Sequence, residues 1–285
     1  METKEKLIDS LLTLAFAEDV GDGDHTTLST IPADETGTQR LIVKEEGILA
    51  GVEIAAKVFE KFDPSLKMTV YITDGTHVRP GDVAFEVTGP VRSLLQTERV
   101  MLNIMQRMSG IATQTARYQA RLDGLKTKVL DTRKTTPGLR MLEKEAVRIG
   151  GGMNHRIGLF DMILIKDNHV DFAGGITQAV NAAKAYCREK GKDLKIEVEV
   201  RNTDEIREAL AAGIDRIMLD NFTPERTREA VELIHSLDDK VEIESSGGIT
   251  LDTLRDYGEC GVDFISVGAL THSVKGLDMS FKAAK

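Results

Sequence analysis

The second half of the chain repeats one pattern, in which a short β-rich run is followed by a helical one. Six β-rich runs end in polar residues or glycine, and they are VLDTRK, MILIKDN, KIEVEVR, RIMLDNF, VEIESSGG and FISVGA. Helical patterns such as NTDEIREALAAG lie between most of them, and several close with glycine, a common helix terminator. This repeated alternation of strand and helix predicts a parallel sheet with right-handed crossovers.

The spacing of these runs favours a barrel over an open sheet. From Lys166 to Val267, successive strand ends lie 21 to 33 residues apart, which suits βα units. No G-x-G-x-x-G motif follows the first strand, as it would in a dinucleotide-binding sheet. Because only six strands are convincing, fewer than a complete barrel has, we expect an incomplete (β/α) barrel with about six or seven parallel strands.

Residues 1–107 lack this alternation and predict an α/β N-terminal domain. A first helix, a second helix near 52–62 and short strands within 68–89 are expected there, with turns at Asp74-Gly75 and Pro80-Gly81. One portion, HVRPGDVAFEV, is similar to the turn of biotinyl-like sandwich folds. It lacks the lysine that such domains modify, and we therefore interpret it as structural.

A long helical pattern from about 94 to 122, interrupted or bent near Ser109-Gly110, leads into the barrel. We therefore expect the barrel-like catalytic domain to occupy residues 108–272. The C-terminal tail, residues 273–285, is a candidate addition to the N-terminal domain.

The composition narrows the class of protein. A hydrophobic content of 41% and a charged content of 29% are ordinary for a soluble globular chain of 285 residues. The net charge of −9 and the lack of a basic tail argue against a protein that coats nucleic acid. The early apolar run LLTLAFA is too short to span a membrane, and no secretion signal is visible. The two cysteines, Cys187 and Cys260, favour a reduced cytoplasmic protein over a disulfide framework.

Against this acidic background, residues 132–169 gather positive charge. Besides two histidines, the span holds Arg133, Lys134, Arg140, Lys144, Arg148, Arg156 and Lys166. Like charges repel in a partly dry site, so a small and highly anionic substrate is the simplest explanation. Arginine holds a carboxylate in a bidentate fork, and two arginines with a lysine suit a dicarboxylate. The three cations at helical spacing, Arg140, Lys144 and Arg148, fit a solvated stripe as well as a pyrophosphate-facing one.

In a parallel barrel, the residues that follow the strands meet at one mouth, where active sites lie. Glu199 and Asp220 end adjacent predicted strands, where they either pair with Lys166 and Arg133 or help to hold a hard divalent cation. Glu197 lies two residues before Glu199 and competes with it for either role. Small residues at 245–248 and 267–269 end the last two strands, where they either expose N–H groups to a phosphate or permit tight helix–strand packing.

Several other site types are excluded by their missing signatures. His155 and His169 have no cysteines at metal-ligand spacing, which argues against a zinc site. There is no G-x-S-x-G motif and no P-loop signature. Neither cysteine has an activating setting, so acyl transfer through a nucleophile has little support.

A series of motifs, all in one order, resembles the quinolinate phosphoribosyltransferase family, also called nicotinate-nucleotide pyrophosphorylase (carboxylating). The motifs are TRKTTPGLR, LEKEAV, GGGMNHR, LIKDNH, EVEV, MLDNF, ESSGGI and SVGALTHS. ERVMLNIMQRMSGIAT, at 98–113, is similar to the helix that leads into that family's barrel, and the DHTT near the N-terminus also fits. The resemblance covers nearly the whole chain, and its long middle motif makes it specific.

The resemblance implies a two-domain subunit with an α/β N-terminal domain and an incomplete barrel. It implies a reaction that joins quinolinate to phosphoribosyl pyrophosphate with Mg²⁺ and yields nicotinate mononucleotide, pyrophosphate and carbon dioxide, a step of de novo NAD biosynthesis. It also implies an active site at a dimer interface, in which Arg99 reaches the partner's pocket. We therefore expect a homodimer or a larger homo-oligomer.

The resemblance also assigns roles to the residues at the mouth. Arg133, Arg156, Lys166 and the partner's Arg99 would hold the two carboxylates of quinolinate, and His155 would orient one of them. Lys134 would stabilise the departing pyrophosphate together with Mg²⁺ held by Glu199 and Asp220, directly or through water. The remaining expected substrate contacts, most of them to phosphate, are Thr132, Ser246, Gly247, Gly248, Val267, Gly268, Ala269 and His272.

Three other functions remain open at this point. A nicotinate-using transferase, or a related protein of molybdenum-transport operons, would share the barrel but need fewer cations for a single carboxylate. An aldolase-type barrel would use Lys166 to form an imine. A catalytically silent barrel would bind the phosphorylated sugar and release no pyrophosphate.

Overall fold

The computed structural model describes residues 3–284, and the chain divides into two compact units. The first comprises residues up to 116, together with 135–151 and the residues from 269 onward, and the second comprises 117–134 and 152–268. The boundary expected at residue 107 falls inside α4 (Val91–Arg121), which runs from one unit into the other. The units are therefore interleaved along the sequence.

The first unit is built on an antiparallel sheet in the order β12-β1-β5-β3. The strands are β1 (Thr36–Val43), β3 (Lys67–Val70), β5 (Val83–Pro90) and β12 (Met279–Ala283), and a separate pair is formed by β2 (Gly47–Ile48) and β4 (His77–Val78). The helices besides α4 are α1 (Lys4–Asp19), α2 (His25–Thr30), α3 (Val52–Phe62), α5 (Arg140–Ile149) and α11 (Ala269–His272).

The C-terminal tail belongs to the core of this first unit. Strand β12 pairs along β1, with Phe281 opposite Leu41. The ring of Phe281 lies 5.9 Å from that of Phe59 and 6.2 Å from that of Phe85, and all three side chains are buried. Aromatic rings at these separations form favourable tilted pairs, so the tail strand contributes directly to stability.

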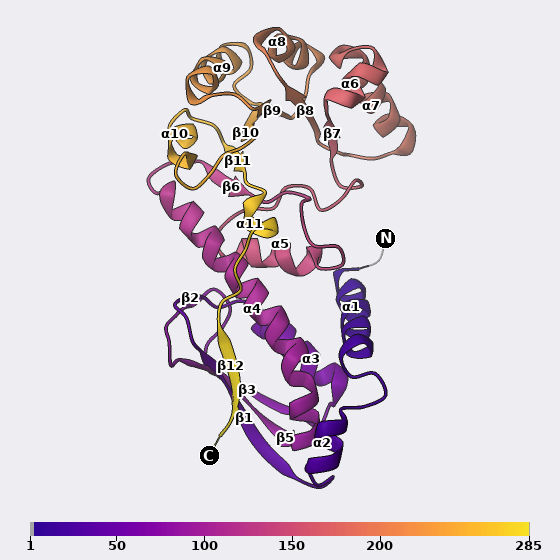
Figure 1. The fold of residues 1–285 in the computed structure, drawn as a ribbon. Helices are drawn as coiled ribbons and strands as arrows, with labels where there is room; N and C mark the ends of the chain where they lie inside the picture. The colour runs from indigo at the N-terminus through magenta and orange to yellow at the C-terminus, as the bar shows by residue number, and fades with distance from the viewer. Residues whose placement is uncertain (1–2, 285) are drawn as a thin grey trace. The chain divides into compact units, whose positions relative to one another are not determined.

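Helix α4 runs for 31 residues without the interruption expected near Ser109-Gly110 (Figure 1). Glycine at 110 answers a different need. A Cβ at this position would lie 2.3 Å from the backbone oxygen of Lys275, so only glycine lets the returning tail cross the helix this closely. The expected interruption was wrong because the sequence alone does not show which segment packs against the helix, whereas a bend at this point stays a prediction.

The second unit contains a parallel sheet in the order β6-β11-β10-β9-β8-β7. Its strands are β6 (Lys128–Leu130), β7 (Ile163–Ile165), β8 (Ile196–Val200), β9 (Arg216–Asp220), β10 (Glu242–Ser246) and β11 (Phe264–Ser266). Each of the six β-rich runs thus contains one strand. The connecting helices are α6 (Asp167–Ala173), α7 (Ile176–Lys190), α8 (Thr203–Ala212), α9 (Pro224–Leu237) and α10 (Leu254–Gly258), seen in Figure 1.

The strand order is that of an incomplete barrel, as the sequence predicts. Around the barrel the strands follow one another in chain order, and β11 closes onto β6. A parallel bridge between Leu130 and Met153 adds a short seventh position beside β6. No pairing within residues 3–284 joins Met153 to β7, so the barrel is open there.

Local sequence signals set the helix limits in this unit. Asn202 and Thr223 accept amide protons from the first turns of α8 and α9, which satisfies otherwise unpaired donors. Gly191 and Gly213 follow α7 and α8 with φ of +60° and +74°, where glycine carries no Cβ penalty. These caps keep the helices short enough to return the chain to the next strand.

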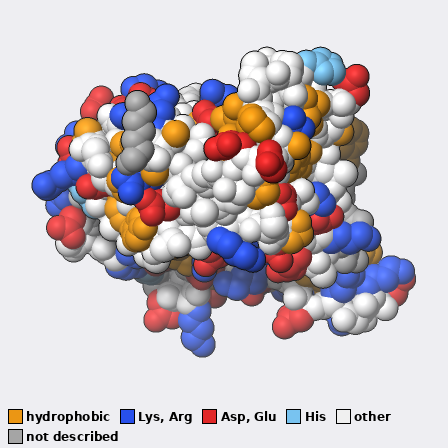
Figure 2. Space-filling view, turned by 90° about the horizontal axis from the view of Figure 1, so that it is seen from below, with side chains coloured by type: hydrophobic (Ala, Val, Ile, Leu, Met, Phe, Trp, Pro, Cys, Tyr) orange, Lys and Arg blue, Asp and Glu red, His pale blue; other side chains and the backbone are white. Residues whose placement is uncertain are grey.

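The surface shows no extended region of one charge on the face seen in Figure 2, where acidic and basic side chains are interspersed. Among the helices of the described residues, none combines the length and the apolar character that crossing a bilayer demands.

Candidate active site

Within the second unit, the carboxyl ends of neighbouring strands bring several predicted residues to one edge. Asp220 and Ser246 are register partners on β9 and β10. Glu199 lies one strand further along, on β8, and Lys166 follows β7. The Nζ of Lys166 lies 2.5 Å from Oε2 of Glu199, whose side chain is 10% exposed. The mouth expected from the sequence therefore exists, and it places a lysine–carboxylate pair beside a second carboxylate.

The glycine-rich turn after β10 packs tightly against the end of β9. Asn221, which donates to the Asp220 carboxylate at 2.7 Å, has a φ of +55°. The backbone amide of Asn221 donates to the backbone oxygen of Ser246 at 2.9 Å. A Cβ on Gly247 would lie 2.2 Å from the side-chain oxygen of Asn221. Gly247 thus serves packing, whereas Gly248 has no atom within 4 Å of such a Cβ and is exposed. The packing explanation therefore holds for Gly247, and a phosphate contact at Gly248 stays a prediction.

The end of β11 corrects one expectation. The amide of Val267 donates to the Leu130 oxygen at 2.9 Å and is part of the sheet, so it cannot also donate to a phosphate. Val267 is 2% exposed, which agrees with a structural role. Its neighbour Gly268 is half-buried and remains a candidate for a phosphate contact.

The segment after β6 presents its cations to solvent. Arg133 and Lys134 are exposed, and the Lys134 amide donates to the hydroxyl of Thr132 at 3.0 Å. This local bond turns the chain directly after the strand. Exposure leaves both cations accessible to a ligand at the same edge as Glu199.

Arg156 lies in a different setting. It is half-buried, with Nη1 3.4 Å from the Met162 oxygen, and it lines a pocket of about 260 Å³ together with Asn154, His155, Ile157, Asp161, Met162, Lys195 and Arg216. Burial and, next, the like charge of Arg133 lower the pKa of Arg156. A guanidinium stays charged in proteins, so this lowering means that its charge is held at a cost that a nearby anion would relieve.

His155 is buried in the barrel interior. Its Nε2 lies 3.0 Å from Oε2 of Glu197 and 3.4 Å from Oε2 of Glu244, and both carboxylates have no exposure. Burial and the charge of Glu244 raise the pKa of Glu197 to about 7. Glu197 therefore belongs to this inner cluster, and Glu199 is the glutamate that pairs with Lys166 at the mouth. The metal-holding role stays a prediction. The role expected for His155 toward a substrate stays a prediction.

Several expected residues belong to the first unit. Ala269 and His272 are in α11, and His272 is exposed. Arg99 is exposed on α4. On α5, Lys144 is 2% exposed, whereas Arg148 is exposed and pairs with Glu145 at 3.0 Å, so the α5 cations do not form a uniform solvated stripe.

Sequence reasoning missed three charged groups near this site. Glu244 and Arg216 lie in the barrel interior, with Nη1 of Arg216 3.6 Å from Oε2 of Glu244. Asp131 is buried and accepts the amide of His155 at 2.9 Å. A signal existed for Glu244, because alternation along EIESS places Glu242, Glu244 and Ser246 on one face of the strand.

Comparisons with known proteins agree with this geometry. Residues 24–109 and 111–282 match family models described as the N-terminal and C-terminal domains of quinolinate phosphoribosyl transferase. The chain belongs to the quinolinate phosphoribosyltransferase family.

Relatives match over most of their own length. A nicotinate-nucleotide pyrophosphorylase [carboxylating] of Arabidopsis thaliana is 46% identical over 96% of the chain and 82% of the relative. A probable one of Bacillus subtilis is 45% identical over 95% of the chain and 91% of the relative. The solved structure of the nicotinate-nucleotide pyrophosphorylase from Francisella tularensis has a TM-score of 0.91 and 41% identity, covering 100% of this chain and 98% of the other.

Membership of the quinolinate phosphoribosyltransferase family confirms the resemblance seen in the sequence motifs and makes this protein a phosphoribosyltransferase. The motifs that carry the resemblance supply the residues of the mouth. LIKDNH contributes Lys166, EVEV contributes Glu199 and MLDNF contributes Asp220.

The buried histidine predicts a pH dependence of stability. Burial opposes a charge on His155, but Glu197 and Glu244 outweigh it and raise its pKa from 6.5 to about 9. A group whose pKa is raised by folding stabilises the folded state fully below its unfolded pKa of 6.5. That stabilisation is lost as the pH rises through the folded pKa of about 9. We expect the free energy of unfolding to fall by on the order of 1 kcal/mol across this window.

Urea unfolding at several pH values between 6 and about 9 measures this change. His155→Gln should flatten the dependence, whereas His235→Gln, at an exposed position on α9, should retain it. An unchanged slope in His155→Gln would contradict the assignment.

Proposed function

We propose that the protein transfers the phosphoribosyl group of phosphoribosyl pyrophosphate to quinolinate with decarboxylation, giving nicotinate mononucleotide, pyrophosphate and carbon dioxide for NAD biosynthesis. The choice of substrate is supported by the pair Arg133 and Arg156. Burial and the like charge of Arg133 make the charge of Arg156 costly, and a bound anion would relieve that cost. Quinolinate brings two adjacent carboxylates, which suit two guanidinium forks and a lysine.

The site residues would promote the reaction mainly by orientation and charge. Holding both carboxylates aims the ring nitrogen at C1 of the sugar and reduces the entropy cost of the attack. Lys134 would stabilise negative charge on the departing pyrophosphate, and Lys166 would help to hold the carboxylates. Once the new bond has formed, the positive ring nitrogen accepts the electrons that departing carbon dioxide leaves at C2. No lysine adduct is required.

The proposal includes Mg²⁺, held by Glu199 and Asp220 directly or through water. These carboxylates end adjacent strands, and hard oxygen ligands of this kind suit Mg²⁺ together with substrate phosphates. Glu199 is ion-paired with Lys166 at 2.5 Å, so a second cation would have to share or replace that partner. When bound, the ion would neutralise charge on pyrophosphate.

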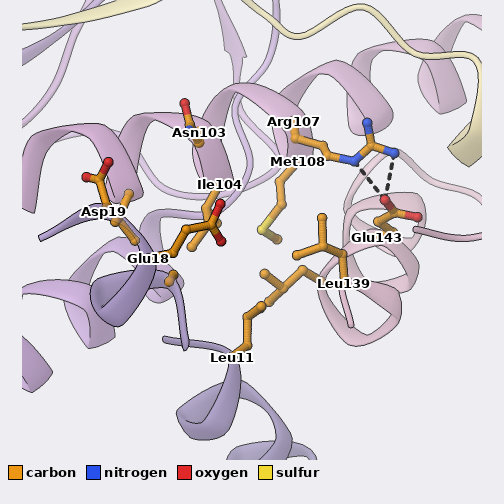
Figure 3. Close-up of a pocket in the computed structure, with 12 residues that line it drawn as sticks. Leu11, Glu18, Asp19, Asn103, Ile104, Arg107, Met108, Leu139 and Glu143 are labelled. Atoms are coloured by element: carbon orange, nitrogen blue, oxygen red, sulfur yellow. Dashed lines mark hydrogen bonds and ion pairs between the residues drawn. The ribbon is translucent and has the colours of Figure 1, made fainter. Parts of the chain in front are cut away.

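The proposal also includes a homodimer with shared active sites. Arg99 is exposed on α4, and the next residue, Val100, lines an apolar cavity of about 360 Å³ within the first unit. Leu11, Ile104, Met108 and Leu139 point into this cavity, with Glu18 and Asp19 at one end and the Arg107–Glu143 ion pair at the other (Figure 3). An apolar hollow beside an exposed arginine suits a contact with a second subunit. Larger assemblies and a cytoplasmic location stay predictions.

The function is tested by mixing the purified protein with Mg²⁺, phosphoribosyl pyrophosphate and either quinolinate or nicotinate. We expect nicotinate mononucleotide and stoichiometric carbon dioxide from quinolinate, and little product from nicotinate because one carboxylate leaves part of the cation set unpaired. Product from nicotinate alone would favour a nicotinate-using transferase. Borohydride treatment with substrate should trap no adduct on Lys166, and a trapped adduct would favour the aldolase class.

Arg156→Ala should raise KM for quinolinate by about 100-fold or more, because it removes a guanidinium that binds a quinolinate carboxylate. KM for phosphoribosyl pyrophosphate should stay within about twofold, because Arg156 does not contact that substrate in the proposal. Initial-rate kinetics with each substrate varied in turn provide the measurement. Arg188→Ala, at an exposed position on α7, is the matched control and should change neither constant. Equal losses for both substrates would refute this division of roles.

Shared active sites predict that two inactive variants restore each other. Arg99→Ala and Lys166→Ala alter different units of the chain, and each alone should abolish most activity. Mixed dimers would contain one intact site, so unfolding and refolding an equal mixture should recover about a quarter of wild-type activity. A mixture as inactive as its components would contradict a site that two subunits share.

A further inference from the structure

Below the mouth, the interior of the barrel holds a layer of charge whose two glutamates and arginine have no role in the proposed reaction. Glu197 on β8 and Glu244 on β10 are fully buried, and the side chain of His155 is only 6% exposed. Arg216 on β9 lies 3.6 Å from Glu244 and is also paired with Glu242 at 2.8 Å. The guanidinium of Arg216 in turn stacks on the ring of Phe264 on β11 at 4.4 Å. Four neighbouring strands thus contribute to one buried cluster.

Stability alone does not account for this layer. Barrel interiors are normally filled with branched apolar side chains. Two buried carboxylates carry a desolvation penalty that their ion pairs rarely exceed, and apolar residues of similar size are often at least as stable. A buried charged layer directly beneath a binding site therefore calls for a functional explanation.

The histidine of this cluster connects it to the chain that carries Arg156. Its Nδ1 accepts the Arg156 amide proton at 2.7 Å, while Nε2 faces the two carboxylates. Since Nδ1 accepts, Nε2 is the protonated nitrogen. On the other side, the His155 amide donates to Asp131 at 2.9 Å, and the Asn154 side chain donates to the same carboxylate at 2.6 Å. The start of the loop is thus held at two points.

This loop, residues 154–162, crosses the place where the barrel is open. No strand pairing within the described residues holds its backbone between Met153 and β7. The amides of Ile157 and Gly158 bind the Asp161 carboxylate at 2.7 and 2.8 Å, but these bonds are internal to the loop. The position of the Arg156 backbone therefore depends on side chains from the barrel, and the His155 ring is the one bonded to its amide.

We propose that Glu197 and Glu244 are positioning residues, which hold the His155 ring from inside the barrel and thereby fix the Arg156 backbone for quinolinate. The inference rests on the proposed function for the identity of that ligand. Arg216 balances one of the two carboxylates and is itself held by Glu242 and Phe264, so the cluster has a rigid base. Quinolinate then meets a guanidinium whose location is set before it binds, which lowers the ordering cost of binding.

The protonation of the ring agrees with this arrangement. Burial would lower the pKa of His155, but the facing carboxylates of β8 and β10 raise it to about 9. The other charged groups around the ring are Arg216 on β9, Asp131 after β6 and Arg156 itself. Because Nδ1 accepts the Arg156 amide proton, it carries no proton itself. The additional proton that this cluster retains up to about pH 9 therefore lies on the carboxylate side, between Nε2 and the two glutamates, where it maintains their contact.

The main test is Glu244→Gln, which keeps the shape of the side chain and removes its charge. If Glu244 is a positioning residue, KM for quinolinate should rise about tenfold, because Arg156 is no longer held in place for the carboxylate. The value of kcat and the KM for phosphoribosyl pyrophosphate should each stay within about twofold. The matched control is Glu205→Gln, on the outer helix α8, which removes the charge of a carboxylate that is paired with Arg201. This variant should change none of these constants. An unchanged KM for quinolinate, or equal rises for both substrates, would overturn the proposal.

A second measurement uses the wild-type protein and does not depend on the folding of a variant. In ¹³C,¹⁵N-labelled wild-type protein at neutral pH, the His155 ring signals, assigned through the backbone resonances of this residue, should show Nδ1 without a proton and Nε2 with one. A ring protonated at Nδ1 would break the bond to the Arg156 amide and overturn the proposal. If wild-type protein made no nicotinate mononucleotide, the proposed function would fail, and the ring-nitrogen measurement would still decide whether these contacts exist.

Discussion

The register of the parallel strands β8, β9 and β10 sets the positions of the charged side chains that these strands carry into the barrel. On each strand, side chains two residues apart point to the same side. Glu197 and Glu199 on β8 therefore share a face, as do Arg216 and Asp220 on β9, and the pairing of Ser246 with Asp220 aligns β10 with them. A shift of one residue in any strand would turn these groups out of the barrel, so the site and the fold depend on the same pairing.

This alignment separates the polar groups into two levels with different tasks. The inner level, with Glu197, Glu244 and Arg216, is dry, and its charges must be balanced among themselves and with His155. The outer level, with Glu199 and Asp220, reaches solvent, so its charges can be shared with ligands. The desolvation penalty of the inner level is acceptable only because each of its carboxylates faces a cation or a proton donor.

The sequence predicted most of the fold, because periodicity, turn residues and glycine caps are local signals. All six β-rich runs became strands, and helices close at Gly191 and Gly213 as expected. Two expectations were wrong, namely a helix interruption at Gly110 and a phosphate contact from the Val267 amide. Both positions are determined by partners distant in the sequence, Lys275 and Leu130. The inner cluster was missed for a related reason. Charged residues in short strands look like strand ends until the register shows which of them lie inside.

The two kinds of cation differ in whether the protein already neutralises them. Lys166 has a carboxylate partner in Glu199 at 2.5 Å, so its charge is balanced before any ligand arrives. For Arg156, burial and the charge of Arg133 lower the pKa, and the charges of Glu197 and Asp161 offset this only in part. For an anion that binds here, as proposed, the main gain in charge pairing would therefore be at Arg156. A ligand with one carboxylate would leave a half-buried guanidinium without a counter-charge, and the cost of that unpaired group would work against its binding.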